Sequence, residues 1–148
     1  MQAQEFLEQI IKINYEFKNK MKEKQQLLEM AGYSSGQGDG ERVQSSGSQD
    51  RMAQLVAKAV DVELQAIETF LNEQMRIRND VLQVIEQLPA DQYDILHLVY
   101  VQDFTLKQAG AMKGISKSWA QEMHNRGRDN VQRILDAREK ERKENELS

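Results

Sequence analysis

The sequence predicts an all-α protein, in which a long helical hairpin or coiled-coil arm precedes a small C-terminal domain of three helices. Residues that favour helices, such as Gln, Glu, Lys and Leu, are abundant among the 148 residues, and the only proline is Pro89. No strand-like alternation of Val, Ile and Thr occurs. Apolar residues instead recur at spacings of three and four, which is the period of a helix with one buried side.

The first expected helix occupies residues 1–32. Its apolar positions alternate at spacings of four and three residues, as they do in the seam of a coiled coil. The members of this seam, two of them polar, are Leu7, Ile10, Asn14, Phe17, Met21, Lys24 and Leu28. Gly32 suits the position that ends the helix. An amphipathic helix packed within one small domain is the alternative interpretation.

Residues 33–50 are rich in Gly, Ser and Gln and contain little that a core could bury, so they predict a flexible linker. Its length allows the first helix to fold back on the next one, or to exchange between two chains. The glycines Gly36, Gly38 and Gly40 do not indicate a phosphate-binding loop, because no strand precedes them and the Gly-Lys-Ser/Thr motif is absent.

Residues 51–88 predict a second long helix, with Asp50 as its N-cap. Its apolar seam is interrupted in the middle by Gln74 and Arg78. Packed antiparallel against the first helix, it would complete the arm. Each helix then has apolar area to spare, so we expect the arm to pair chains into a dimer or a higher oligomer. The residues expected to drive this pairing are Leu64, Ile67, Leu71, Phe17 and Met21.

A new element is expected at Pro89, which cannot donate a backbone hydrogen bond inside a helix. Asp91 is the expected N-cap of an apolar helix of about three turns, which ends at Asp103. Thr105, followed three residues later by Gln108, predicts a capping box at the start of a short helix.

The short helix is followed by Gly114, Ile115 and Ser116. Glycine suits the left-handed position after a helix, Ile115 would pack beneath both helices, and Ser116 is the expected N-cap of the next helix. That helix carries one apolar stripe, formed by Ala120, Met123, Gly127, Val131 and Ile134. Residues 89–136 therefore predict a helix-turn-helix domain, and the charged residues 137–148 predict a helix end that frays into a tail.

The pattern formed by Thr105-Leu106, Gly114-Ile115-Ser116 and Arg126 resembles region 4 of sigma-70-type factors. The resemblance covers about the last third of the chain and extends to phage regulators of the ArpU-like and RinA-like type, which share this helix-turn-helix. The short helix departs from the family pattern, which has Ile-Ala and then Leu before the Gly, because this chain has Ala109-Gly110 and Lys113. Gly110 would permit close helix approach, and Gly127 stands where Ala is usual. The resemblance implies a DNA-binding transcription regulator of phage or prophage origin, and in particular an activator of late genes.

The net charge of −4 is unevenly distributed along the chain. Residues 1–103 contain 10 Lys and Arg against 17 Asp and Glu, whereas residues 104–135 contain 6 Lys and Arg against 2 Asp and Glu. The basic charge is thus concentrated on the part expected to meet DNA phosphates. The acidic remainder would weaken non-specific binding, which suits a regulator that gains affinity by pairing or from a partner.

Polar residues near the start of the last helix lie outside its apolar stripe, where a recognition helix reaches base edges in the major groove. The candidates for base reading are Lys117, Ser118, Gln121 and Asn125. Gln and Asn suit adenine, whereas Lys suits guanine. The candidates for phosphate contact are Lys107, Lys113, Arg126 and Arg128. Trp119 is expected to pack at the edge of the stripe, and contact with a base or sugar is its alternative role.

Several functions are not predicted. Cysteine is absent, which excludes disulfides and thiolate chemistry. His97 and His124 lack the spacing of metal ligands. His97 is expected to pack between helices, whereas His124 is expected either to contact phosphate or to lie plainly on the surface. We expect no catalytic set, metal or cofactor, and hence no enzyme. No apolar run reaches the roughly 18 residues that a membrane span needs, and the start does not resemble a signal peptide, so the bacterial cytoplasm is the expected location.

Three functions remain open from the sequence. A transcription regulator would bind promoter DNA, either at an upstream operator or while also contacting RNA polymerase as sigma region 4 does. A DNA-packaging subunit similar to a small terminase would combine a helix-turn-helix with an oligomerisation arm, and it would form a large ring. A helical adaptor or anti-factor would bind protein alone, and the negative net charge favours this third interpretation.

Overall fold

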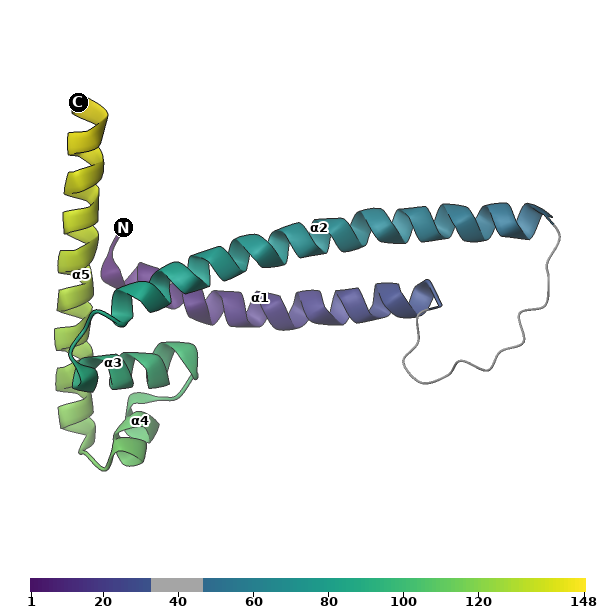
Figure 1. Cartoon of the computed structure of the whole chain (residues 1–148). Helices are drawn as coiled ribbons and strands as arrows, with labels where there is room; N and C mark the ends of the chain where they lie inside the picture. The colour runs from purple at the N-terminus through teal and green to yellow at the C-terminus, as the bar shows by residue number, and fades with distance from the viewer. Residues whose placement is uncertain (33–46) are drawn as a thin grey trace. The chain divides into compact units, whose positions relative to one another are not determined.

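Five α-helices and one π-helical turn make up the described part of the computed structural model, which comprises residues 1–32 and 47–148 (Figure 1). In chain order they are α1 (Ala3–Met30), α2 (Gly47–Ile85), α3 (Ala90–Leu96), the π-helical turn η1 (His97–Val101), α4 (Leu106–Lys113) and α5 (Lys117–Leu147). No strand occurs in these ranges, and the all-α prediction is confirmed.

Two helix starts differ from the prediction. α2 begins at Gly47, so Asp50 lies inside the helix and is not its N-cap. The rest of the predicted linker, residues 33–46, lies outside the described residues. α3 begins directly after Pro89, and no side chain caps it. Asp91 lies instead in the first turn, where its carboxylate interacts favourably with the positive end of the helix dipole.

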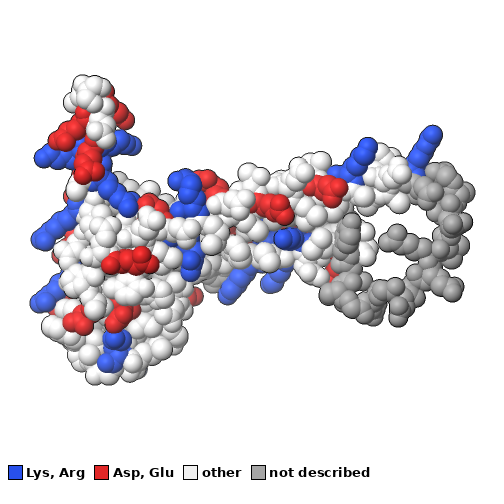
Figure 2. Space-filling view, in the orientation of Figure 1, with Lys and Arg blue, Asp and Glu red and all other residues white. Residues whose placement is uncertain are grey.

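The C-terminal end of α5 remains helical as far as Leu147, so the prediction of a fraying tail is wrong. Pairs of side chains one turn apart stabilise this segment. Gln132 Nε2 donates to Asp136 Oδ1 at 3.0 Å, and Lys143 Nζ lies 3.4 Å from Glu139 Oε1. Figure 2 shows basic and acidic side chains interspersed along this end of α5, which is therefore a solvated helix surface.

The chain divides into two compact units, and each long helix contributes to both. The first unit comprises Met1–Asn14 and Arg76–Ser148, and the second comprises Tyr15–Met75. From the sequence, both long helices are expected to lie entirely in the arm. The structure differs because the first turns of α1 belong to the core of the first unit, where Leu7 and Ile10 are each 0% exposed.

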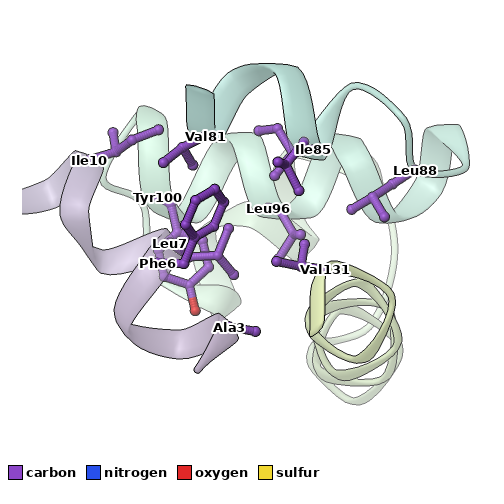
Figure 3. Close-up of a cluster of buried hydrophobic side chains, with 11 residues drawn as sticks. Ala3, Phe6, Leu7, Ile10, Val81, Ile85, Leu88, Leu96, Tyr100 and Val131 are labelled. Carbon is purple, nitrogen blue, oxygen red and sulfur yellow. The ribbon is translucent and has the colours of Figure 1, made fainter. Parts of the chain in front are cut away.

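The main core of the first unit joins α1, α2, the α3–η1 segment and α5 (Figure 3). Its buried members are Ala3, Phe6, Leu7, Ile10, Val81, Val84, Ile85, Leu88, Leu96, Tyr100 and Val131. Polar contacts join the same elements at the margin of this core. Asn14 Nδ2 donates to the carbonyl oxygen of Val101 at 3.3 Å, and the Ala3 amide donates to Gln132 Oε1 at 2.7 Å. The predicted polar seam position Asn14 thus faces the first unit.

A second, smaller core lies beneath the last two helices of the same unit. Its buried members are Ile95, Leu98, Ala109, Ala120 and Met123, drawn from α3, η1, α4 and α5. The π-helical turn continues α3 through the bond from the Gln102 amide to the His97 carbonyl oxygen, at 3.0 Å. Asp103 ends it at φ 61°, a left-handed conformation that Asp adopts more readily than most residues.

In the second unit, the C-terminal part of α1 and the N-terminal part of α2 run antiparallel side by side (Figure 1). The buried side chains of α2 here are Val60, Ile67 and Leu71. Among the other residues predicted to pair chains, Phe17 and Leu64 are half-buried, whereas Met21 is 44% exposed. Ile67 and Leu71 therefore already bury their side chains within one chain.

Candidate nucleic-acid interface

The start of α4 is held by the predicted capping box. Thr105 Oγ1 accepts a hydrogen bond from the Gln108 amide at 3.1 Å. The Thr105 amide donates in return to Gln108 Oε1 at 2.9 Å. Both bonds satisfy backbone amides that the start of a helix leaves without partners. The capping-box prediction is confirmed, and it fixes where α4 begins.

The turn after α4 also has the predicted geometry. Gly114 adopts φ 69° and ψ 28°, the left-handed conformation expected of a residue that ends a helix. The Ile115 amide donates to the Gly110 carbonyl oxygen at 2.9 Å, and Ile115 packs against the second core. Ser116 Oγ accepts from the Trp119 amide at 3.1 Å and so caps α5. This sequence of bonds sets the direction in which α5 leaves the turn.

Two glycines allow the helices to approach closely. A Cβ atom at Gly110 would lie 3.1 Å from the Ile115 carbonyl oxygen and 3.3 Å from that of Ser116. A Cβ atom at Gly127 would lie 2.9 Å from Leu96 Cδ1. Both positions depart from the family pattern noted above, and the structure explains them as sites where α4 meets the turn and α5 meets α3.

The predicted stripe of α5 faces the protein interior. Ala120, Met123, Gly127 and Val131 are buried, and Ile134 is half-buried. The opposite side of the first turns of α5 consequently faces outward.

The predicted base-reading residues share this outward side. Lys117, Ser118 and Gln121 are exposed, and Asn125 is half-buried. Gln121 Nε2 donates to Asn125 Oδ1 at 2.9 Å, so these two amides form one hydrogen-bonded pair. Side chains on successive turns of one helix face lie close enough to act together. The geometry therefore brings the four predicted residues onto one polar surface.

The four predicted phosphate contacts have different surroundings. Lys107 is exposed on α4. Lys113 Nζ lies 2.6 Å from Asp94 Oδ2, and this hydrogen bond, followed by the attraction of the same carboxylate, raises the pKa of Lys113. Arg126 Nε donates to Glu122 Oε1 at 2.9 Å. Arg128 is half-buried. Two of the four cations are therefore already paired with carboxylates of the same unit.

A buried polar group behind this surface was not predicted. His124 is 8% exposed, so the prediction of a phosphate-contacting or plain surface residue is wrong. Its Nε2 lies 2.7 Å from Tyr100 Oη, and its Nδ1 lies 3.4 Å from Asn125 Oδ1. Burial lowers the pKa of His124 and the nearby charge of Arg128 lowers it further, although the hydrogen bond to Asn125 acts in the opposite direction. His124 thus links the core to the polar surface.

The surroundings of Trp119 and His97 bear on two further expectations, and that for Trp119 needs correction. Trp119 is 44% exposed and does not pack in the stripe; the Arg126 guanidinium lies 5.6 Å from the centre of its ring. Guanidinium groups are attracted to aromatic faces at this distance. His97, which was expected between helices, is half-buried and has contacts with Tyr93 and Gln102. Its ring centre lies 5.5 Å from that of Tyr93, and its Nδ1 lies 2.9 Å from Gln102 Nε2.

These features, a capped short helix, a glycine turn and a capped longer helix with a buried stripe, define a helix-turn-helix. Residues 84–133 match the family model for sigma-70, region 4. The chain therefore carries a sigma-70 region 4-like helix-turn-helix, which covers about a third of its length. No curated protein and no solved structure matches the chain.

Two kinds of feature were not found in the described ranges. None of the helices there is both long enough and apolar enough to cross a membrane. No cluster of three or more His, Asp or Glu side chains in the same ranges is arranged to hold a metal ion.

Proposed function

We propose that this protein is a sequence-specific DNA-binding transcription regulator, in which the first turns of α5 enter the major groove. The observation that carries the proposal is the outward polar surface of Lys117, Ser118, Gln121 and Asn125 on a helix that the turn and the buried stripe hold in place. Residues near the start of the second helix of such a motif reach base edges. The match to sigma-70 region 4 supports the same assignment.

The proposed roles follow from side-chain chemistry. The amides of Gln121 and Asn125 suit the edge of adenine, and the ammonium group of Lys117 suits guanine. Lys107 is the phosphate contact that needs no rearrangement, because it is exposed. Lys113 and Arg126 would first exchange a carboxylate for a phosphate. Each such exchange reduces the free energy gained from a phosphate contact. A smaller phosphate contribution suits a protein that binds its specific site better than random DNA.

The biological setting is proposed from the resemblance of the Thr105-Leu106 and Gly114-Ile115-Ser116 segments to phage late-gene regulators. We propose a phage or prophage regulator that activates late genes as a dimer or higher oligomer. Contact with RNA polymerase is a further element of this proposal, by analogy with sigma region 4. No catalytic role is proposed.

The test uses the full chain and a duplex selected by the wild-type protein from a random DNA pool, compared with an unselected duplex of equal length. Gln121→Ala and Asn125→Ala should each weaken binding to the selected duplex by about 1–3 kcal/mol and change little on the unselected one. Lys107→Ala should weaken binding to both duplexes and reduce the slope of log affinity against log salt concentration by about one. Lys140→Ala, at the exposed end of α5, is the matched control and should alter neither.

Equal losses of Gln121→Ala, Asn125→Ala and Lys107→Ala on both duplexes would remove the recognition-helix assignment. A wild-type protein that selects no duplex, yet shows the helical circular dichroism expected of its fold, would leave the protein-binding adaptor as the remaining interpretation. Circular dichroism of every variant separates loss of binding from loss of folding.

A further inference from the structure

α2 carries a second apolar stripe, beside the one buried in the second unit. Its members recur at spacings of three and four, and they are Met52, Leu55, Ala59, Val62 and Ala66. All five are exposed, and the three larger ones are 63–65% exposed. Single exposed apolar residues are ordinary, but a continuous stripe over several turns is typical of a surface that packs on another helix.

This stripe is distinct from the residues that hold the second unit together. Ile67 is 4% exposed and Leu71 is 8% exposed, and both lie on the side of α2 that packs within the chain. The side chains that the sequence alone suggested for chain pairing are therefore partly used within one chain. The exposed stripe is an apolar surface that a second chain can reach, and Met52 at its start also lines a hollow with Met30 and Ala31.

We infer that the exposed stripe is the interface with a second copy of this chain, with the two α2 helices parallel and in register. The charges that flank the stripe support this occupant. Lys58 lies on one flank and Glu63 on the other, and both are exposed. In a parallel pair, a residue on one flank faces the residue five positions later on the partner helix. Lys58 of each chain would then face Glu63 of the second copy, so the dimer would contain this pair twice.

An antiparallel pair is disfavoured by the same residues. In an antiparallel pair, each flank of the stripe would face the same flank of the partner helix. The flank with Lys58 also carries Arg51, so positive charges would face each other. Repulsion would then replace attraction. The small side chains of Ala59 and Ala66 would let the two helices approach closely in the parallel arrangement.

This inference concerns the oligomer that the proposed function uses, and mass measurements without DNA test it separately from DNA binding. Sedimentation velocity of the full chain over a range of concentrations should show a dimer that dissociates on dilution. Leu55→Glu and Val62→Glu should each raise the dimer dissociation constant by on the order of a hundredfold or more, because two carboxylates would be buried per dimer. Met112→Glu replaces an equally exposed apolar residue on α4 and should leave the dimer unchanged.

Charge exchange tests the register. Lys58→Glu and Glu63→Lys should each raise the dissociation constant by roughly two- to thirtyfold, since two exposed pairs are lost. The double variant should restore the wild-type value, because it rebuilds both pairs with reversed sign. Lys58 and Glu63 are five residues apart and do not face each other within one helix, so a contact within the chain does not explain such a rescue.

Covalent trapping tests the orientation. The chain contains no cysteine, so Met52→Cys gives a single thiol. Oxidised glutathione should convert it to a disulfide-linked dimer, with two thiols oxidised per bond formed and two molecules of reduced glutathione released. The parallel pair brings the two Met52 positions together, whereas an antiparallel pair centred on the stripe places Met52 opposite Ala66.

A wild-type chain that stays monomeric at high concentration overturns the inference, as does a dimer that survives Leu55→Glu and Val62→Glu. Stripe variants that lower thermal stability of a monomer indicate that the chain itself covers the stripe, which also overturns it. Additive losses in the two charge variants without rescue exclude the parallel register.

Discussion

Gly127→Ala sets two effects of similar size against each other. Ala in a helix is favoured over Gly by about 1 kcal/mol. The new Cβ atom, however, would lie 2.9 Å from Leu96 Cδ1 and 3.2 Å from Leu96 Cγ, and Leu96 is 0% exposed in the main core. Adding a methyl group to such a packed site costs about 1–3 kcal/mol. We expect the packing cost to exceed the gain, and the variant to lose about 1 kcal/mol of unfolding free energy.

Urea unfolding measures this balance. Trp119 is the chain's only tryptophan and lies in the same unit as Gly127, so its fluorescence reports on that unit. Ala137→Gly, at an exposed position of the same helix, calibrates the helix term and should cost about 1 kcal/mol. Leu96→Val removes the crowded methyl group, so the double variant with Gly127→Ala should be more stable than additivity predicts by at least about 0.5 kcal/mol. A Gly127→Ala protein that gains the full calibrated amount would refute the argument.

Two further predictions concern the same unit. Thr105→Ala should lower the unfolding free energy by about 1 kcal/mol, because the Gln108 amide loses its acceptor. Thr105→Ser keeps a hydroxyl acceptor and should retain most of the wild-type stability, and urea titration of both variants is the check. Burial lowers the pKa of His124 below its unfolded value of about 6.5. Below that value the unfolded chain binds more protons than the folded one, so the unfolding free energy should fall as the pH decreases toward the pKa of the folded state. His124→Gln should flatten this dependence between pH 7 and 5, and an unchanged slope would contradict the lowered pKa of the buried imidazole.

The local chemistry of the helix-turn-helix was predictable because neighbours in the sequence determine it. The capping box needs only Thr105 and Gln108 at the right spacing, and the turn needs a glycine followed by an N-cap residue. Fixed spacing along one helix also predicts the buried stripe of α5. None of these features depends on where distant segments of the chain lie.

The division of the long helices between two units was not predictable in the same way. The seam spacing of α1 is the same at Leu7 and Ile10 as at Phe17, and it identifies a buried side without identifying the partner. In the structure, Leu7 and Ile10 pack in the core beside Val81 and Val131, whereas Phe17 belongs to the second unit. Periodicity predicts which side of a helix is buried, and only the tertiary structure shows what covers it.

His124 illustrates a different limit, and it bears on the proposed DNA interface. It lies four residues after Ala120 and seven before Val131, so the stripe's own spacing includes it. Its polarity favoured a surface position, because the sequence does not show that the Tyr100 hydroxyl lies 2.7 Å from its Nε2. The Tyr100 hydroxyl also lies 3.2 Å from Gln4 Oε1. In the tautomer that carries the imidazole hydrogen on Nδ1, Nε2 accepts from the Tyr100 hydroxyl and Asn125 Oδ1 accepts from Nδ1, as it also accepts from Gln121 Nε2. Asn125 would then offer its Nδ2 donor to a base, so Tyr100→Phe should weaken binding to the selected duplex more than to the unselected one, although Tyr100 itself lies in the core.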